Sequence, residues 1–438
     1  NKQEGDSVMS GSINEEATIY VKVTVDPSQS MVQKIINFVV AAQTNKTKAE
    51  SWIDRFEEKY VYVVLIMSFL LMVVPPILGI WDQSTSFYRG IVLLVVASPC
   101  ALVASISPTM LATMSNAARK GILIKGAQPI EALSEVDYIF LDKTGTITKG
   151  EPKVMHVEID ATQNYDEVIA ALYHAEKHSN HPLAKSIVQY LENQRTFEKI
   201  DFQTSETPGQ GVTITVKGHE YSIGRFPVSY ASPLDKKAEE AIARGFTIVN
   251  IVRQEILVGF ILLMDTIRDN VRETIASLHS MDVKVVMLTG DNQQTGSQIA
   301  QLVGIDEVKG NLYPEDKVKE LKKLKQKGYV VMMVGDGIND SPALSAADIG
   351  LAMGSGTDVS LETADIVLMN DNMINLAEVI RLSKKAKRIA LQNVVFSIFV
   401  IVFLILMNVL QIVDLPLGVV FHEGSTILVI LNGLRLLK

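Results

Sequence analysis

The sequence predicts a multidomain membrane protein that combines an α-helical transmembrane bundle with an α/β domain and an inserted α+β domain. Four long apolar stretches predict the helices of the bundle. Between the second and third stretches lie roughly 270 residues, which is enough for two domains. Part of that segment alternates between strand and helix patterns, which is typical of a doubly wound parallel sheet. The remainder has strand patterns of its own, which indicates an inserted domain.

Each apolar stretch is close to the length of about 20 residues that a transmembrane helix needs. The stretches run near Tyr60–Ile80, Ile91–Met114, Val394–Ile412 and Leu415–Leu434. Basic residues lie at the ends that adjoin the polar regions: Lys46, Lys48, Arg55, Lys59, Arg119, Lys120, Lys125, Lys384, Lys385, Lys387, Arg388, Arg435 and Lys438. By the positive-inside rule, both large polar regions are expected to be cytoplasmic. We therefore expect a multi-pass protein that contacts the lipid of a bacterial cell membrane.

The composition excludes several other classes of protein. The formal net charge is −8, and the chain has no basic run typical of nucleic-acid binding, so no nucleic-acid partner is expected. The segment Lys317–Lys327 is rich in lysine but has apolar residues at helical spacing, so it is interpreted as a solvated helix face. Cys100 is the single cysteine of this sequence, which excludes a disulfide and a Cys-x-x-Cys metal-binding module within these residues.

The predicted α/β domain contains a run of short strands, several of them followed by a helix. The predicted elements are strands at Val136–Leu141, Val283–Leu288, Val330–Val334, Ile349–Ala352 and Ile366–Met369, with helices from Gln294 and Pro342. The inserted domain has predicted strands at Val212–Val216, Thr247–Val252 and Ile256–Ile261.

The most informative motif is the heptapeptide from Asp142 to Thr148, Asp-Lys-Thr-Gly-Thr-Ile-Thr, which follows the predicted strand Val136–Leu141. An acidic residue at the carboxyl end of such a strand lies where α/β folds place reactive groups. The turn behind it offers backbone N–H groups to phosphate oxygens, and Lys143 supplies positive charge. A carboxylate in this position can act as a nucleophile and form an aspartyl-phosphate. The alternative is an aspartate that only caps a turn.

The heptapeptide resembles the phosphorylation signature of the P-type ATPases, and the resemblance extends along nearly the whole chain. It implies a cation pump that passes through a phosphorylated Asp142. It also implies a haloacid-dehalogenase-like phosphorylation domain, interrupted by a nucleotide-binding domain. The expected domain bounds are 1–45 for part of a β-rich actuator domain, 46–125 for a membrane hairpin, 126–150 and 263–372 for the phosphorylation domain, 151–262 for the nucleotide-binding domain, and 373–438 for a linker helix and a second hairpin.

A second carboxylate motif runs from Val334 to Asp340, Val-Gly-Asp-Gly-Ile-Asn-Asp, and also follows an apolar strand. Phosphoryl transfer depends on charge neutralisation, and Mg²⁺ prefers carboxylates, waters and phosphate oxygens as ligands. Asp142 and Asp336 are expected to hold Mg²⁺, with Asp340 as support. By resemblance, the Thr144 carbonyl completes the ligand shell. The alternative for the second motif alone is a turn.

Two further segments acquire roles through the resemblance. Thr289 and Gly290 are expected to bind the phosphoryl group, and Asp291 is expected to steady the Mg²⁺ and phosphate. Lys317 matches the lysine of the family that pairs with phosphoryl oxygens, a task suited to a compact point charge. The alternative for Lys317 is an ordinary surface lysine.

The inserted domain has features that resemble the ATP site of the heavy-metal branch. His181, followed by Pro182, is expected to contact the adenine end of ATP. The expected ATP-binding residues are Glu176, His181, Gly209, Gly211 and Gly224, in which the glycines allow the backbone to approach the nucleotide.

The second apolar stretch contains Ser98-Pro99-Cys100. Proline breaks the helix there, and a thiol beside the break can become a thiolate ligand for a soft or borderline metal. The motif resembles the transport motif of heavy-metal P-type ATPases, and that resemblance makes Ser98 and Cys100 candidate ligands for the transported ion. Packing is the alternative role of a lone cysteine.

The last apolar stretch contains His422, Glu423 and Thr426, and ionisable residues within a membrane segment indicate a functional site. Cysteine, histidine and glutamate together suit Zn²⁺, Co²⁺ or Fe²⁺. The two membrane motifs resemble the subgroup of pumps associated with those metals, and the choice among the three stays open. Asn393 and Asn408 either line the ion path or form hydrogen bonds between helices.

The chain begins within the expected actuator domain, with a strand pattern at Thr18–Val25, and the Thr-Gly-Glu-Ser loop that dephosphorylates family members is absent from this sequence. We expect an ATP-driven exporter of a divalent metal, in monomeric form. The rival from another class is a membrane-tethered haloacid-dehalogenase phosphatase. Such enzymes carry a second aspartate two residues after the nucleophile, where this chain has Thr144. A third possibility is a non-transporting fragment that only binds nucleotide.

Overall fold

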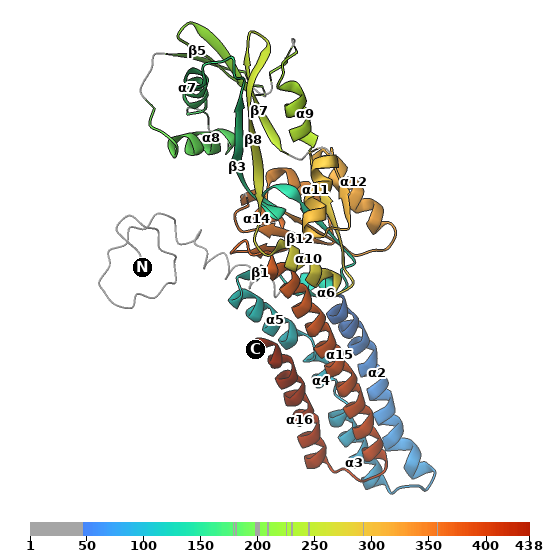
Figure 1. Ribbon diagram of the computed structural model, residues 1–438. Coiled ribbons are helices and arrows are strands. Elements are labelled where there is room, and N and C mark those ends of the chain that lie inside the picture. Colours follow the sequence, from blue (N-terminus) through green and yellow to red (C-terminus); the bar gives the residue numbers. More distant parts are fainter. Residues whose placement is uncertain are drawn as a thin grey trace, which may run out of the picture. The chain divides into compact units, whose positions relative to one another are not determined.

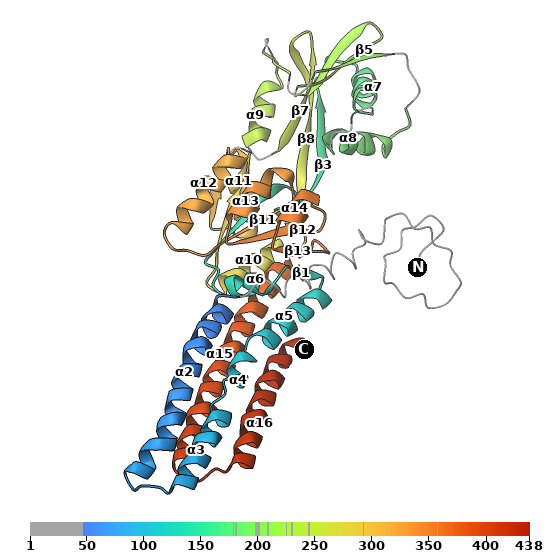
Figure 2. The same cartoon turned by 180° about the vertical axis from the view of Figure 1, so that it is seen from behind.

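The computed structural model describes residues 47–438, apart from positions 178, 180–181, 198–201, 208–209, 225, 229–230, 244–245, 292 and 357. The expected actuator segment 1–45, with its strand at Thr18–Val25, lies outside the described residues. The chain divides into two compact units (Figures 1 and 2). One unit contains the described residues up to Val136, Asp365–Met369 and Glu378–Lys438, and the other contains Asp137–Ala364 and Asn370–Ala377.

The first unit is mainly a bundle of long helices. Its helices are α2 (Lys48–Ile77), α3 (Gln83–Val96), α4 (Cys100–Val103), α5 (Ser107–Arg119), α6 (Ala127–Leu133), α15 (Ile374–Val409) and α16 (Leu415–Leu434). In both views α2, α3, α15 and α16 run side by side. Among the described residues, the segments Lys48–Ile77, Gln83–Arg119, Ile374–Val409 and Leu415–Leu437 are long and apolar enough to cross a membrane. These segments contain, or overlap closely, the four expected spans.

Close packing holds the bundle together. Val92 and Val96 of α3 pack against Leu404 of α15. A Cβ atom on Gly418 of α16 would lie 2.7 Å from Val96, so glycine lets α16 approach α3 closely. Much of the remaining apolar surface faces outward. Only 11% of the most apolar segment of α2 is buried, as expected for a surface that meets lipid or other helices. The same unit contains the antiparallel pair β1 (Ile122–Ile124) and β13 (Ile366–Leu368).

The second unit contains the predicted parallel sheet. Its strands lie in the order β12 (Ile349–Met353), β11 (Val331–Gly335), β2 (Tyr138–Asp142), β9 (Lys284–Leu288) and β10 (Glu307–Lys309), and the pairs with a described register are parallel. The accompanying helices are α10 (Val271–His279), α11 (Gln293–Val303), α12 (Pro314–Lys325), α13 (Ser341–Ala346) and α14 (Asp358–Thr363). The alternation of strand and helix in the sequence thus predicted the fold of this sheet. The expected strand Ile366–Met369 is present as β13, and its register with Ile122–Ile124 of β1 is antiparallel.

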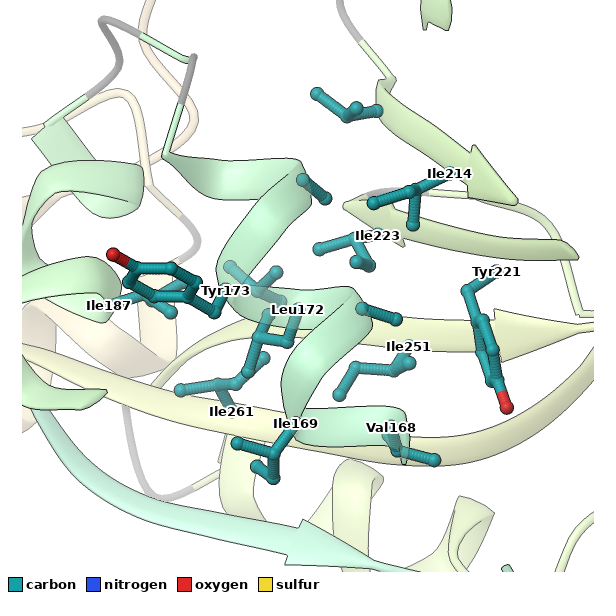
Figure 3. Packing of buried hydrophobic residues seen from close by; sticks show 14 of the residues in the cluster. Val168, Ile169, Leu172, Tyr173, Ile187, Ile214, Tyr221, Ile223, Ile251 and Ile261 are labelled. Atoms are coloured by element: carbon teal, nitrogen blue, oxygen red, sulfur yellow. The ribbon is translucent and has the colours of Figure 1, made fainter. Parts of the chain in front are cut away.

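The inserted segment forms an antiparallel sheet in the order β3 (Thr148–Ile159), β8 (Ile256–Ile267), β7 (Thr247–Arg253), β6 (His219–Gly224), β5 (Gly211–Val216) and β4 (Gln203–Thr207). Helices α7 (Tyr165–Glu176), α8 (Pro182–Glu192) and α9 (Asp235–Ala243) accompany it. Figure 3 shows Val168, Ile169 and Leu172 of α7 beside apolar side chains of the sheet, and these residues share one core. The apolar alternation of β5 provides the buried Ile214 on that face.

The antiparallel sheet connects to the parallel sheet through two long paired strands. β3 and β8 pair from Thr148↔Ile267 to Ile159↔Gly259, with irregular register between Thr148 and Pro152. The expected boundaries at 150/151 and 262/263 therefore fall inside continuous strands. A two-stranded ribbon, with its register shift next to the parallel sheet, is the physical link between the two domains.

Candidate active site and transport site

Asp142 is the last residue of β2, at the carboxyl end of the parallel sheet. Its neighbours in the sheet are β11, which ends at Gly335, and β9, which ends at Leu288. Because parallel strands end at the same edge, the loops that follow these three strands converge there. The fold thus gathers the motifs that begin at Asp142, Thr289 and Asp336, although they are far apart in the sequence.

Three carboxylates meet at this edge. Oxygen atoms of Asp142, Asp336 and Asp340 all lie within 4.8 Å of one another. It is the one group of three such potential ligands that occurs in the described part of the chain. Asp142 and Asp340 are buried, with 7% and 2% of their surface exposed, and Asp336 is partly buried.

Lys317 places a cation in the same cluster. It lies in the first turn of α12, is 6% exposed, and donates hydrogen bonds to Asp142 and, over 2.7 Å, to Asp340. Pro314 begins the helix and Asp316 accepts from the backbone N–H of Tyr313, so the sequence fixes where this turn starts. Burial lowers the pKa of Lys317, but the charges of Asp142 and Asp340 outweigh it and raise the pKa overall. Lys317 is therefore a buried, charged part of the site and not an ordinary surface lysine.

Crowding changes the acidity of the carboxylates. Burial, assisted by the negative charge of Asp340, raises the pKa of Asp142 to about 7, although Lys317 acts in the opposite direction. Burial and Asp340 likewise raise the pKa of Asp336 to about 6, against the charge of Arg268. The site therefore has an excess of negative charge that a bound cation would compensate.

The turn after Asp142 is shaped for close approach. The Asp142 carboxylate accepts a hydrogen bond from the Thr144 backbone N–H over 3.0 Å. Gly145 has φ +70°, and a Cβ atom there would lie 1.5 Å from Oδ2 of Asp336. Only glycine allows the turn to pass so close to that carboxylate.

Two loops flank the cluster and are joined by an ion pair. Lys143, beside Asp142, pairs with Asp291. Thr289 is 2% exposed, and its hydroxyl oxygen accepts from the backbone N–H of Asp291 over 3.0 Å. Gly290 lies between them, where a Cβ atom would meet the Leu312 carbonyl at an ordinary 3.5 Å. The structure therefore brings the Thr289–Asp291 segment to Asp142, as the sequence predicts.

Arg268 and Asp265, which the sequence motifs did not single out, support the turn. Arg268 donates to the Gly145 carbonyl over 2.7 Å and forms an ion pair with Asp371 at 3.7 Å. The Thr148 hydroxyl lies 3.0 Å from the Lys143 carbonyl and 2.5 Å from the carboxylate of Asp265. One signal for these residues was present in the sequence, since charged residues cluster at the end of the apolar strand β8.

The expected nucleotide residues are only partly described. His181 and Gly209 lie outside the described residues. Glu176 ends α7 and is 8% exposed, and burial raises the pKa of its carboxyl to about 7. Gly211 and Gly224 face each other across β5 and β6 with φ +140° and +136°. A Cβ atom on Gly211 would lie 2.1 Å from the Ile223 carbonyl oxygen, and one on Gly224 would lie 2.1 Å from the Gln210 carbonyl oxygen. The close approach of the two backbones therefore requires glycine at both positions, in addition to the expected approach of a nucleotide.

The expected transport residues lie in the membrane bundle. The second span is interrupted after Val96 and again between Val103 and Ser107. Cys100 is exposed, begins α4, and its Sγ lies 2.9 Å from Oγ of Ser98. The sequence thus located this break correctly, because proline cannot continue the hydrogen-bond pattern of the helix.

On α16, His422 is 4% exposed, whereas 62% of the Glu423 side chain is exposed. The His422 Nε2 and Glu423 Oε1 atoms are 4.0 Å apart, and the Thr426 hydroxyl donates to the His422 carbonyl over 3.3 Å. Within the described residues, these side chains and Cys100 do not form a three-ligand group comparable to that of the aspartates.

The two intramembrane asparagines form hydrogen bonds between helices, which is one of the two roles expected for them. Asn393 of α15 donates to the Ser105 and Val429 carbonyls, each over 3.2 Å. Asn408 donates to the Arg89 carbonyl over 3.0 Å.

Comparisons with known proteins extend this description. Residues 136–348 match the family model of haloacid dehalogenase-like hydrolases. The chain is 45% identical to a zinc-transporting ATPase of Bacillus subtilis, over 100% of this chain and 69% of the relative. It is 36% identical to a probable cobalt/nickel-exporting P-type ATPase of Mycolicibacterium smegmatis, over 100% of this chain and 67% of the relative.

The fold is also similar to a solved structure. A crystal structure of a zinc-transporting PIB-type ATPase in the E2.Pi state matches 95% of this chain and 69% of its own chain. The TM-score is 0.79 and the sequence identity is 34%.

Proposed function

Because this chain belongs to the heavy-metal-transporting P-type ATPases, we propose that it uses Asp142 as the phosphorylated residue and moves a borderline divalent cation. The observation that carries the proposal is the cluster in which Lys317 lies against Asp142 and Asp340. A strand-end carboxylate, a glycine turn and a buried lysine are the parts that phosphoryl transfer needs.

Different residues of the chain supply the nucleophile, the groups that bind the phosphoryl oxygens and the groups that bind ATP. Asp142 attacks the γ-phosphorus of ATP as a carboxylate, an O–P bond to Asp142 forms, the bond to the bridging oxygen breaks, and ADP leaves. Lys317 and the Thr289–Gly290 segment bind phosphoryl oxygens, and Lys143 is held in place by Asp291. Glu176, His181, Gly209, Gly211 and Gly224 are proposed to form the ATP-binding surface of the inserted domain.

The aspartate cluster has the hard oxygen donors that Mg²⁺ prefers, and its raised pKa values indicate a need for positive charge. Asp142 and Asp336 would hold the ion together with the Thr144 carbonyl, and Asp340 would support them. When bound, Mg²⁺ neutralises charge on the transferring phosphoryl group. A cation in this position also favours the ionised, nucleophilic form of Asp142.

Thr144 bears on the stability of the phosphoenzyme. Phosphatases with this fold typically have a second aspartate at that position as an acid/base group, and threonine cannot take that role. The phosphorylated state therefore persists long enough to change the membrane helices, which a pump needs and a phosphatase does not. The similarity to transporting ATPases agrees with this choice.

We assign the transported ion to the ligands of the broken span and the last helix: Ser98, Cys100, His422, Glu423 and Thr426. Sulfur, nitrogen and oxygen donors together suit Zn²⁺, Co²⁺ or Fe²⁺. One relative is named for zinc and another for cobalt and nickel, which agrees with a divalent cargo. The direction is export from the cytoplasm, where the ATP-binding domains lie by the positive-inside rule, and the working form is a monomer.

Phosphorylation by γ-labelled ATP tests the first part of the proposal. Wild-type protein should form a hydroxylamine-labile phosphoprotein, and Asp142→Asn should form none. Asp282→Asn is the matched control, since Asp282 is exposed and asparagine tolerates its φ of +61°. Equal labelling of the Asp142→Asn variant would refute the assignment.

A metal series tests the cargo. Zn²⁺, Co²⁺ or Fe²⁺ should stimulate ATP hydrolysis, and Cys100→Ala should remove that stimulation. If Cu⁺ stimulated the activity and the divalent ions did not, the assigned cargo would be wrong.

A further inference from the structure

The hydroxyl group of Tyr60, in α2, donates a hydrogen bond to the carbonyl of Ala97 over 2.8 Å. Ala97 directly follows α3, at the point where the second membrane span is interrupted. Tyr60 is half-buried, whereas Ala97 is 1% exposed. A side chain from one span therefore pairs with backbone at the break of another.

The break explains why this carbonyl needs a partner. In a continuous helix, the Ala97 carbonyl would accept from the N–H of Ala101. Pro99 interrupts the pattern, and α4 begins only at Cys100. A buried carbonyl without a partner is costly at membrane depth, so the Tyr60 hydroxyl replaces a bond that the regular helix would have supplied.

The phenol ring is itself held in place. Trp52, Phe56 and Tyr60 lie one turn apart on α2, and their rings stack with centroid separations of 5.6 and 5.4 Å. Such stacks favour a defined ring orientation. Tyr62 has no comparable stacked position among the described rings and is 66% exposed.

We propose that Tyr60 is a positioning residue for the transported metal, and this inference rests on the proposed role of Cys100 as a ligand. Its hydroxyl keeps the Ala97 carbonyl away from the Ala101 N–H and so maintains the interrupted helix. The interruption determines how Ser98 and Cys100, whose Oγ and Sγ atoms are 2.9 Å apart, face the ion path. Tyr60 touches neither the metal nor the phosphorylation site in this role.

The test compares Tyr60→Phe with Tyr62→Phe, since each change removes one hydroxyl from the same helix and keeps the ring. The probe is Co²⁺ titrated into the purified protein in detergent, followed by the near-ultraviolet thiolate-to-Co²⁺ charge-transfer band. Cys100 is the chain's single cysteine, so Cys100→Ser provides the blank for that band. Loss of one hydrogen bond predicts that Tyr60→Phe binds Co²⁺ about 5-fold more weakly, while Tyr62→Phe binds as the wild type does.

The unfolding temperature of each variant is measured in parallel. Weaker Co²⁺ binding by Tyr60→Phe without a matching loss in Tyr62→Phe supports the positioning role. Equal Co²⁺ affinity in Tyr60→Phe and wild type overturns it, and a lower unfolding temperature with unchanged affinity does so as well, because it shows a purely structural bond. A wild-type protein without the Cys100-dependent band instead overturns the proposed metal site, and the inference with it.

Discussion

Lys317 donates a hydrogen bond to the carboxylate of Asp142, although 175 residues separate the two in the sequence. The same ammonium group also lies 2.7 Å from Asp340, so one cation serves two buried carboxylates. A compact ammonium group satisfies both because its donors can rotate, which the planar fork of arginine cannot do. The arrangement places positive charge where phosphoryl oxygens would arrive.

Replacement of Lys317 by methionine should reduce the rate of phosphoenzyme formation by roughly 100-fold or more, since one oriented donor at a reacting group is worth that much. Lys317→Arg should restore little of the loss. Lys323→Met is the control, because Lys323 lies on the same helix with its side chain 65% exposed. Rapid-quench measurement of the labelled phosphoprotein gives the rates, and a Lys317→Met rate within a few-fold of the control would contradict the assignment.

Gly145→Ala should abolish phosphorylation. The new Cβ atom would lie 1.5 Å from the Asp336 carboxylate, so that the side chain must leave the cluster, and the positive φ adds backbone strain. Gly218→Ala separates the two effects, since Gly218 has φ +81° but no atom within 4 Å of the position that its new Cβ atom would take. The control should lose about 1 kcal/mol of stability and keep full labelling. Unchanged labelling of Gly145→Ala would show that the turn is not so closely packed when ATP is bound.

The free energy of unfolding of the inserted domain should fall as pH rises, because of the carboxyl group of Glu176. Its folded pKa of about 7 lies above the ordinary value of 4.5, because burial disfavours the charged form. The folded state therefore binds more protons between these values, and stability falls as pH rises from 4.5 to 7, by at most about 3 kcal/mol. Glu176→Gln should flatten this dependence, and the exposed Glu239→Gln should not.

Unfolding temperatures across that pH range provide the measurement for Glu176. A profile of Glu176→Gln that parallels the wild type would show that this carboxyl is not the cause.

Asn393→Leu should destabilise the membrane bundle by about 1 kcal/mol. The change removes donors to the Ser105 and Val429 carbonyls, and it also removes the oxygen that accepts from Asn432 over 2.8 Å. Gln392→Leu is the control, since Gln392 is the exposed neighbour on the same helix. Thermal unfolding in detergent distinguishes the two variants, and equal unfolding temperatures would mean that the asparagine network contributes no net stability.

Local features of the sequence were sufficient to predict most helices and strands and part of the candidate site. The alternation of apolar runs located β2, β9 and β11, because a buried parallel strand reads as a short apolar segment. Parallel pairing then followed from the intervening helices, and with it the meeting of Asp142, Thr289 and Asp336 at one edge. The apolar spans were equally plain, since bilayer thickness sets their length.

Contacts between residues far apart in the sequence could not be predicted in this way. Arg268 reaches the Gly145 carbonyl, and Tyr60 reaches the Ala97 carbonyl, yet neither residue carries a local pattern that marks its partner. The close approach of Gly211 to Gly224 likewise depends on the pairing of β5 with β6.

The sequence by itself determined the chemistry available to this protein: a strand-end carboxylate, a second acidic turn, a proline beside a thiol and ionisable groups in apolar helices. These signals are local because strand ends, turns and helix breaks depend on neighbouring residues. The tertiary structure alone decided which groups act together: Lys317 with Asp142 and Asp340, Arg268 with the glycine turn, and Tyr60 with the broken helix. Such pairings depend on register and packing between distant segments, and no short-range pattern encodes them.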